Sequence, residues 1–343
     1  MSSDMAMAAK ARAMFGERMK EPDYLALMQK KSVAEIAGAL KRGSVFSEAL
    51  AGVNEKAVHA GQLEALVRMD VYRRLQKLLR YSEGDYGRFI YAAVETEEID
   101  LILSSIRWFT QKDSEARSSM IADMPIYIGH YLSFDVKKLP EVTNFSDLIK
   151  VLKGTRYERI VRKYETKDMA QINYIGLEHE LRLNYYETVM EVVSGYGRAG
   201  NDMMEIVKAR IELDNIALIY RLKKYFHAPP DQIRPLVTHT TNLFNDREME
   251  DLISSSTAEQ VIEKLQKKYH RYVKNVKFTS IEHYTGMIRY HMNYHFMELS
   301  TEPKLVLLSY LLLSRIEIQN VVNIIEGVSY GIGIDHMKPM LVY

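Results

Sequence analysis

A carboxylate and an amide interrupt an otherwise apolar helical pattern at residues 210–226, RIELDNIALIYRLKKYF. Glu212 and Asn215 are three residues apart, which places them on one face of a helix. The later stretch RIEIQNVVNII repeats the pair as Glu317 and Asn320. Such a pair could bind a ligand or a partner, or it could hold an adjoining helix in register. We interpret it as structural, because buried polar groups are usually hydrogen-bonded within the protein.

Two histidines, His291 and His295, lie four residues apart in HMNYH and could bind zinc from one helical face, with Glu298 nearby. A metalloprotease with this spacing has glutamate directly after the first histidine, and this chain has Met292 there. A third ligand is not evident. We therefore interpret the pair as packed or partly exposed histidines and expect no bound metal.

The stretch GYGRAG, residues 195–200, matches a dinucleotide-binding pattern. That site requires a strand before the glycines, a helix after them and an acidic residue about 20 positions further on. In the internal repeat of this chain, residues 195–200 align with residues 81–86, which lie between two expected helices. We interpret GYGRAG as the loop of a helical hairpin. Because no G-x-x-x-x-G-K-[ST] phosphate loop occurs either, we expect no cofactor.

The composition excludes several other classes of protein. The 343 residues include 46 basic and 45 acidic ones, and a nucleic-acid-binding protein usually has a basic surplus. The basic and aromatic run at residues 264–277 could meet phosphates, but we interpret it as a solvated helix face. The absence of cysteine excludes disulfides and thiolate metal sites and fits a reducing compartment. Apolar residues make up 47% of the chain, enough for a full core.

The apolar residues recur mostly at spacings of three and four, and glycine and proline are scarce at 17 and 8 residues. Alternating strand patterns are rare, so we predict an all-α protein. The expected long helices cover 57–81, 85–121, 170–193, 201–226, 279–298 and 303–329. The longest apolar run, LVLLSYLLL, is shorter than the roughly 20 residues that cross a bilayer, so we interpret it as part of a buried helix. We recognise no secretory signal.

A helix-start pattern occurs three times. A capping residue is followed three positions later by an acidic or amide residue and then by two apolar residues four apart. The three copies begin at Ser32, Asn144 and Thr257, at intervals of roughly 110 residues. The regular spacing predicts an internal triplication.

Two further markers recur in the same order. Glu98, Glu212 and Glu317 begin the sequences EIDLI, ELDNI and EIQNV. The loops VKKL, IRPL and MKPM each follow one of the long helices. The period is too long for a solenoid repeat, so each unit is expected to be a small helical bundle. We predict bundles at residues 1–140, 141–240 and 241–343, closed around a pseudo-threefold axis or set in an open row.

The three helical repeats, the opening ARAM…PDYLALMQKKSVAEIAGALK, and the RIELDN and RIEIQN helices resemble the C/d subunit family of V-type and archaeal-type rotary ATPases. The resemblance covers nearly the whole chain, and its specificity lies in the order and spacing of loose motifs. The first repeat departs from the pattern, because Leu101 stands where the others have Asn215 and Asn320. That asparagine is therefore not required in every unit.

The resemblance implies a non-catalytic, funnel-shaped rotor subunit that links the central stalk to the membrane proteolipid ring. One copy per rotor would transmit torque for ion transport coupled to ATP hydrolysis or synthesis, and the isolated chain would be a monomer. It would lie at the cytoplasmic face of the membrane, attached through protein partners. Within the three loops after the long helices, we select Lys137, Arg234 and Lys338 as candidate partner contacts.

Two rival interpretations remain. One is a different helical scaffold or adaptor that shares only the triplicated architecture. The other is an enzyme with a metal site in a bundle core, which requires Glu-x-x-His pairs on facing helices. The sequence contains no such pair. The polar seam, our name for Glu98, Glu212, Asn215, Glu317 and Asn320, is expected to be structural in the rotor interpretation.

Overall fold

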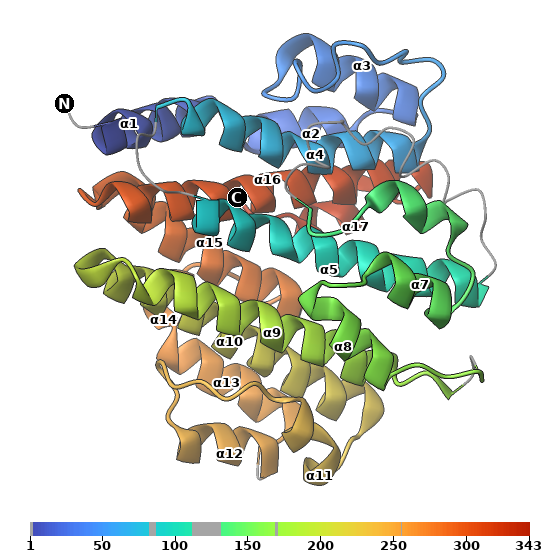
Figure 1. Cartoon of the computed structure of the whole chain (residues 1–343). Coiled ribbons are helices and arrows are strands. Elements are labelled where there is room, and N and C mark those ends of the chain that lie inside the picture. The colour runs from blue at the N-terminus through green and yellow to red at the C-terminus, as the bar shows by residue number, and fades with distance from the viewer. Residues whose placement is uncertain (1–2, 82–86, 112–131, 169–170, 255) are drawn as a thin grey trace. The chain divides into compact units, whose positions relative to one another are not determined.

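The computed structural model describes residues 3–81, 87–111, 132–168, 171–254 and 256–343, with the backbone alone at 87–95, 97 and 110–111. Helices and the loops between them account for these residues, and no strand occurs in the described ranges (Figure 1). The predicted all-α class is confirmed.

The six long helices match the spacing of apolar residues closely. The predicted helix at residues 85–121 is observed as far as Gln111, and residues 112–121 lie outside the described ranges. The boundaries are α4 (Ala60–Leu79), α5 (Gly87–Gln111), α9 (Tyr174–Ser194), α10 (Gly197–Phe226), α15 (Ile281–Leu299) and α16 (Pro303–Ser329). These six predictions are confirmed within the described residues.

The three predicted capping residues each begin a short helix. The side chain of Ser32 accepts a hydrogen bond from the Glu35 main-chain N–H, and Thr257 does the same for Gln260. Asn144 accepts from the main-chain N–H of Asp147 at 3.0 Å. These bonds satisfy N–H groups that have no partner within a helix, which explains why the helices start there. The helices are α3 (Val33–Gly43), α7 (Phe145–Val151) and α13 (Ala258–Lys268).

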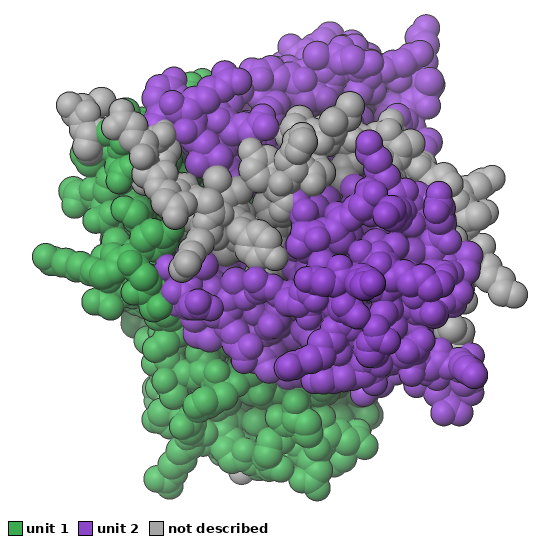
Figure 2. All heavy atoms as spheres, viewed as in Figure 1, with its two compact units in different colours: residues 1–29, 193–343 green, residues 30–192 purple. Residues whose placement is uncertain are grey.

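The chain forms two compact units, coloured separately in Figure 2. Unit 1 contains residues 1–29 and 193–343, and unit 2 contains residues 30–192. The division into three repeats at 1–140, 141–240 and 241–343 concerns similarity between segments, and it stays a prediction.

In unit 1, α16 lies against α1 (Ser3–Gly16) and α15, which brings the first and last segments of the chain side by side (Figure 1). The guanidinium of Arg12 strengthens this contact by donating to the main-chain oxygens of Met297 and Ser300, at 3.0 and 2.5 Å. Helix α10 packs against α13 and α15. The shorter elements are α2 (Glu21–Met28), α11 (Pro230–Ile233), η4 (Arg234–Leu236), α12 (Asp246–Ser254), α14 (His270–Val273), α17 (Ile334–Met337) and η5 (Lys338–Met340).

In unit 2, α3 packs against α4, and α7 packs against α5 and α8 (Arg156–Lys163). A 3-10 helix, η2 (Val136–Glu141), precedes α7 and contacts it. Apolar side chains of these elements, including Ile36, Leu63 and Leu148, are fully buried. Burial of one apolar face on each helix therefore holds unit 2 together.

Helix α16 contains the apolar run at residues 305–313. It is the one helix in the described residues that is long and apolar enough to cross a membrane. However, 72% of its most apolar window is buried inside the protein, and a core helix passes the same test. Leu305, Val306 and Leu307 are at most 1% exposed. The prediction of a buried helix in this region is confirmed.

Candidate functional site

Glu212 on α10 lies in a fully enclosed hydrogen-bonding site. One carboxylate oxygen accepts from the main-chain N–H of Phe244 at 2.8 Å, and the other accepts from the Tyr269 hydroxyl at 2.6 Å. Glu212 and Tyr269 are both 0% exposed. The carboxylate therefore joins α10 to the segment before α12 and to the end of α13.

Burial changes the proton affinity of both side chains. Removal from water raises the pKa of Glu212, although the hydrogen bonds from Tyr269 and Phe244 act in the opposite direction. Burial also raises the pKa of Tyr269, and the neighbouring Glu212 charge adds to this effect. Tyr269 thus remains a protonated donor to Glu212 over the whole physiological pH range.

Asn215, one turn further along α10, binds a different segment. Its amide nitrogen donates to the Thr238 main-chain oxygen at 2.7 Å, and its amide oxygen accepts from the Thr238 main-chain N–H at 3.0 Å. Asn215 and Thr238 are 4% and 7% exposed. The side chain therefore satisfies both buried polar groups of one residue in the loop after η4.

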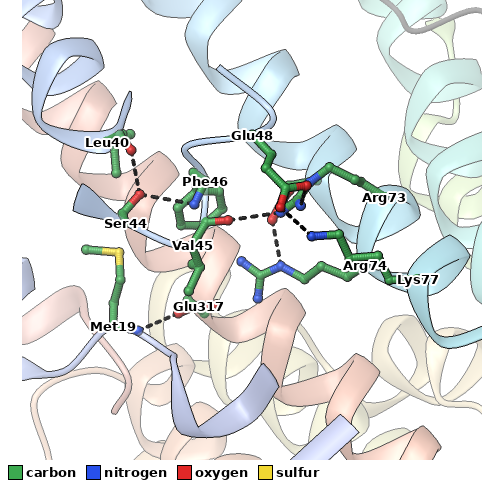
Figure 3. Close-up of polar contacts among 11 residues, drawn as sticks. Met19, Leu40, Ser44, Val45, Phe46, Glu48, Arg73, Arg74, Lys77 and Glu317 are labelled. Atoms are coloured by element: carbon green, nitrogen blue, oxygen red, sulfur yellow. Dashed lines mark hydrogen bonds and ion pairs between the residues drawn. The ribbon is translucent and has the colours of Figure 1, made fainter. Parts of the chain in front are cut away.

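The same two arrangements recur on α16. Asn320 exchanges two hydrogen bonds with the main chain of Val342, at 2.7 and 2.9 Å. Glu317 accepts from the main-chain N–H of Met19 at 2.7 Å (Figure 3). Residues from both ends of the sequence therefore meet at α16 within unit 1.

Glu98 on α5 forms the corresponding site in unit 2. It accepts a hydrogen bond from the Tyr157 hydroxyl at 2.6 Å and another from the main-chain N–H of Ser133. Glu98 is 0% exposed. Leu101, one turn further on, is a buried apolar residue.

Each carboxylate of the polar seam thus binds the main chain just before a short helix, and the three short helices are η2, α12 and α2. Sequence reasoning identified the carboxylates and amides but missed their partners Tyr157, Tyr269 and Met19. A signal for two of them was present, because the tyrosines follow the capping residues Asn144 and Thr257 at nearly equal spacing. Each of the five seam side chains is hydrogen-bonded to another segment of the chain. We call this arrangement a clasp, and its role is structural.

The candidate partner contacts lie in short helices at the exposed surface. Lys137 lies in η2, Arg234 in η4 and Lys338 in η5. Arg234 is bound to Glu250 at 2.6 Å, and this bond lowers the pKa of Glu250 to about 2. Lys338 is 3.1 Å from Glu21. Two of the three cations therefore already have an acidic neighbour in unit 1.

The other motifs take structural positions. The Nδ1 atom of His291 is 2.5 Å from the main-chain oxygen of Tyr272, and His295 is exposed. Within the described residues, no group of three histidine, aspartate or glutamate side chains could hold a metal ion. GYGRAG joins α9 to α10, and Gly197 has the positive φ of 60° that glycine readily adopts. The prediction of a connection between two helices holds for residues 195–196, whereas residues 197–200 form the first turn of α10; residues 82–86 of the aligned stretch lie outside the described ranges.

The basic and aromatic run at residues 264–277 corresponds to α13, α14 and the turn after them. Lys268 is bound to Glu248 at 2.7 Å and to the Leu243 main-chain oxygen at 2.8 Å. Lys264 contacts Asp251. These two lysines therefore serve to attach α13 to neighbouring segments.

A charged cluster that sequence reasoning missed lies on α4 in unit 2. The buried carboxylate of Asp70 binds Arg73 and Arg74, each at 2.6 Å. Arg73 also donates to the Val45 main-chain oxygen at 2.9 Å and contacts Glu48 (Figure 3). The spacing of these residues along one helix was the available signal. The cluster fixes the loop after α3 to α4, which is a structural role.

The architecture is thus that of an all-helical protein whose long helices are joined to other segments of the chain by buried carboxylates and amides. The family model described as "ATP synthase (C/AC39) subunit" matches residues 7–340. The chain belongs to this family, which confirms the resemblance drawn from the repeats.

Individual relatives agree. The chain is 25% identical over 163 residues to the C subunit of the A-type ATP synthase of Methanosarcina mazei, and the match covers 47% of this chain and 43% of that protein. It is 25% identical over 141 residues to the protein of the same name from Methanocaldococcus jannaschii, covering 41% of this chain and 35% of the relative. The matched stretch spans less than half the length of each relative.

Proposed function

We propose that this chain is a non-catalytic rotor subunit that links the central stalk of a V/A-type ATPase to the proteolipid ring in the membrane. Family membership across residues 7–340 supports the rotary complex as its setting. Torque passes through the subunit mechanically in this proposal, and ion transport is coupled to ATP hydrolysis or synthesis in other subunits. One copy serves each rotor, and the isolated chain is a monomer without cofactor.

The observation that carries the proposed mechanical role is the repeated clasp on α10 and α16. Glu212 accepts from the main chain before α12, and Glu317 accepts from the main chain before α2. The N-terminal segment at Met19 therefore binds α16 in the same way as the segment at Phe244 binds α10. This equivalence supports three related bundles closed around a pseudo-threefold axis, because the last bundle is completed by the start of the chain.

A stiff coupling is what torque transmission requires. The seam carboxylates are buried and hydrogen-bonded, so rotating one helix away from its partner segment would leave these groups unpaired at a cost of about 1–3 kcal/mol each. Close packing of the long helices adds resistance to deformation. The polar seam thus holds each long helix in a fixed position relative to the segment that it binds within the same unit.

The exposed cations Lys137, Arg234 and Lys338 are proposed to contact the rotor partners. They occupy η2, η4 and η5, each of which follows a long helix. The chain is proposed to reach the cytoplasmic face of the membrane through proteins rather than by lipid attraction, since its net charge is only +1.

A binding experiment tests the attachment route. The purified chain should sediment with vesicles that contain the proteolipid ring and should remain in solution with vesicles of the same lipid without protein. Equal binding to both vesicles would contradict attachment through the ring. Recovery of this chain from native membranes with an unrelated assembly would favour the alternative of a general helical adaptor.

A further inference from the structure

A cavity of about 670 Å³ lies within unit 1 among α10, α15, α16 and the C-terminal residues Met340 and Val342. Its volume falls within the range of about 300–1,000 Å³ that is common for small-molecule sites. Aliphatic side chains line it, including Ile206, Leu312 and Ile316. The cavity can therefore cover an apolar part of a ligand of moderate size.

The charged side chains that line this cavity are mostly positive. Arg210, Arg289 and Arg315 come from three different helices, and Glu282 is the only acidic residue among the described lining residues. Glu282 is also 3.5 Å from Arg221. The cavity thus has a local excess of positive charge in a chain whose total charge is nearly zero.

One nearby carboxylate, that of Asp214, forms ion pairs with two of these arginines. Asp214 is 2.8 Å from Arg289 through one oxygen and 3.9 Å from Arg210 through the other. The side chains of Arg210 and Arg289 remain 25% and 32% exposed, so solvent or a ligand can still reach them. Asp214 thus contacts two of the three arginines that line the cavity, and Arg315 contributes a third guanidinium group to the lining.

A buried acceptor marks the wall of the same cavity. Asn293 is 3% exposed, and its amide nitrogen donates to the main-chain oxygen of Arg289 at 2.8 Å. Its amide oxygen has no hydrogen-bond partner within the described part of the structure. Buried polar atoms are rarely left unpaired, so a ligand hydroxyl at this point would complete the site.

We propose that this cavity binds a small amphiphilic phosphate: a phosphate group and a hydroxyl carried on a short aliphatic chain. The planar guanidinium groups of Arg210, Arg289 and Arg315 suit a phosphate, to which arginine can donate two parallel hydrogen bonds. The aliphatic chain lies against Leu312 and Ile316, and the hydroxyl donates to Asn293.

The ligand has two possible sources, a soluble phosphate ester or an anionic lipid taken from a membrane. An acidic peptide from a partner is a different class of ligand, and the aliphatic lining favours the amphiphile over it. The proposal concerns ligand binding by the isolated chain and does not depend on the rotor function.

Calorimetric titration with 1-octanoyl lysophosphatidic acid tests the proposal. We expect saturable binding of one molecule per chain, with much weaker binding of octyl glucoside, which lacks the charge, and of glycerol phosphate, which lacks the chain. Vesicles of phosphatidylcholine with phosphatidic acid separate the sources: binding to them supports a membrane lipid, and binding of the free ester alone supports a soluble one. Equal binding of octyl glucoside, or tighter binding of a short acidic peptide than of the ester, would overturn the amphiphilic-phosphate assignment.

Two variants and one control locate the site. Arg315→Gln should weaken binding about tenfold or more, because a hydrogen bond to a charged group is lost. Ile316→Trp fills the cavity without changing its charge and should also weaken binding. Arg247→Gln removes the same charge from an exposed position in α12 and should leave binding unchanged. If a folded Ile316→Trp variant binds as well as the wild type, the ligand lies elsewhere and the proposal is wrong.

Discussion

The main-chain N–H of Met19 donates a hydrogen bond of 2.7 Å to the buried carboxylate of Glu317, 298 residues further along the chain. Phe244 makes the same type of bond to Glu212 at 2.8 Å, but across only 32 residues. One contact is local to the second half of the chain, and the other joins its two ends. Residues 1–29 accordingly belong to the same compact unit as residues 193–343.

Replacing Glu317 with glutamine should destabilise unit 1. The amide oxygen of glutamine is a weaker acceptor for the Met19 N–H than a carboxylate oxygen, so we expect the free energy of unfolding to fall by about 1 kcal/mol in urea titrations followed by circular dichroism. Glu326→Gln is the matched control, because Glu326 is exposed on the same helix. Equal unfolding midpoints for the two variants would show that a carboxylate at this position stabilises the bond to Met19 no better than a neutral amide does.

Replacing Asn215 with leucine leaves the buried N–H and C=O groups of Thr238 without partners. We expect a loss of about 1–3 kcal/mol in the free energy of unfolding, measured in the same way. Asn201→Leu, at an exposed position on α10, should have little effect. Unchanged melting of Asn215→Leu together with lost assembly would instead assign Asn215 to a partner interface.

The raised pKa of Glu212 predicts a pH dependence of defined sign. The folded protein retains this proton at pH values where the unfolded chain, with a pKa near 4.5, has released it. The stability that the group contributes is therefore present below pH 4.5 and declines as the pH rises through the folded pKa. Glu212→Gln cannot titrate, so the stability of the wild type relative to this variant should decrease over the same interval. A relative stability that increases with pH would mean that the hydrogen bonds, and not burial, control this carboxyl.

Reversing the charge of Arg234 tests the proposed partner contacts. Arg234→Glu places a negative charge beside Glu250 and Asp231 and should weaken binding to ring-containing vesicles, as measured by sedimentation at low salt. The exposed position of all three side chains means that the folded chain itself should change little in stability. Arg247→Glu, also exposed on unit 1, provides the same change of charge elsewhere. An equal loss of binding in both variants would indicate a general charge effect.

Apolar periodicity and helix caps were sufficient to predict the long helices and the starts of α3, α7 and α13. These features depend on residues close together in sequence, as in the bond from Gln260 N–H to Thr257. The polar seam was recognisable because Glu212 and Asn215 interrupt an apolar pattern that recurs at Glu317 and Asn320.

The partners of those residues were not predictable in the same way. Nothing in the local sequence of Met19 indicates that its main-chain N–H reaches Glu317, because that bond depends on how the two ends of the chain pack. The cavity near Arg315 was not predictable for the same reason. Its three arginines come from separate helices and lie close together only in the folded unit. Pairings across long sequence separations require the tertiary structure.

The most direct test of the central proposal is ATP-driven ion pumping by a rotary complex prepared with and without this chain. If the chain is the link between stalk and ring, its removal should abolish pumping while the soluble head still hydrolyses ATP, and adding back the purified chain should restore pumping. Full pumping by a complex verified to lack the chain would falsify the rotor-link function.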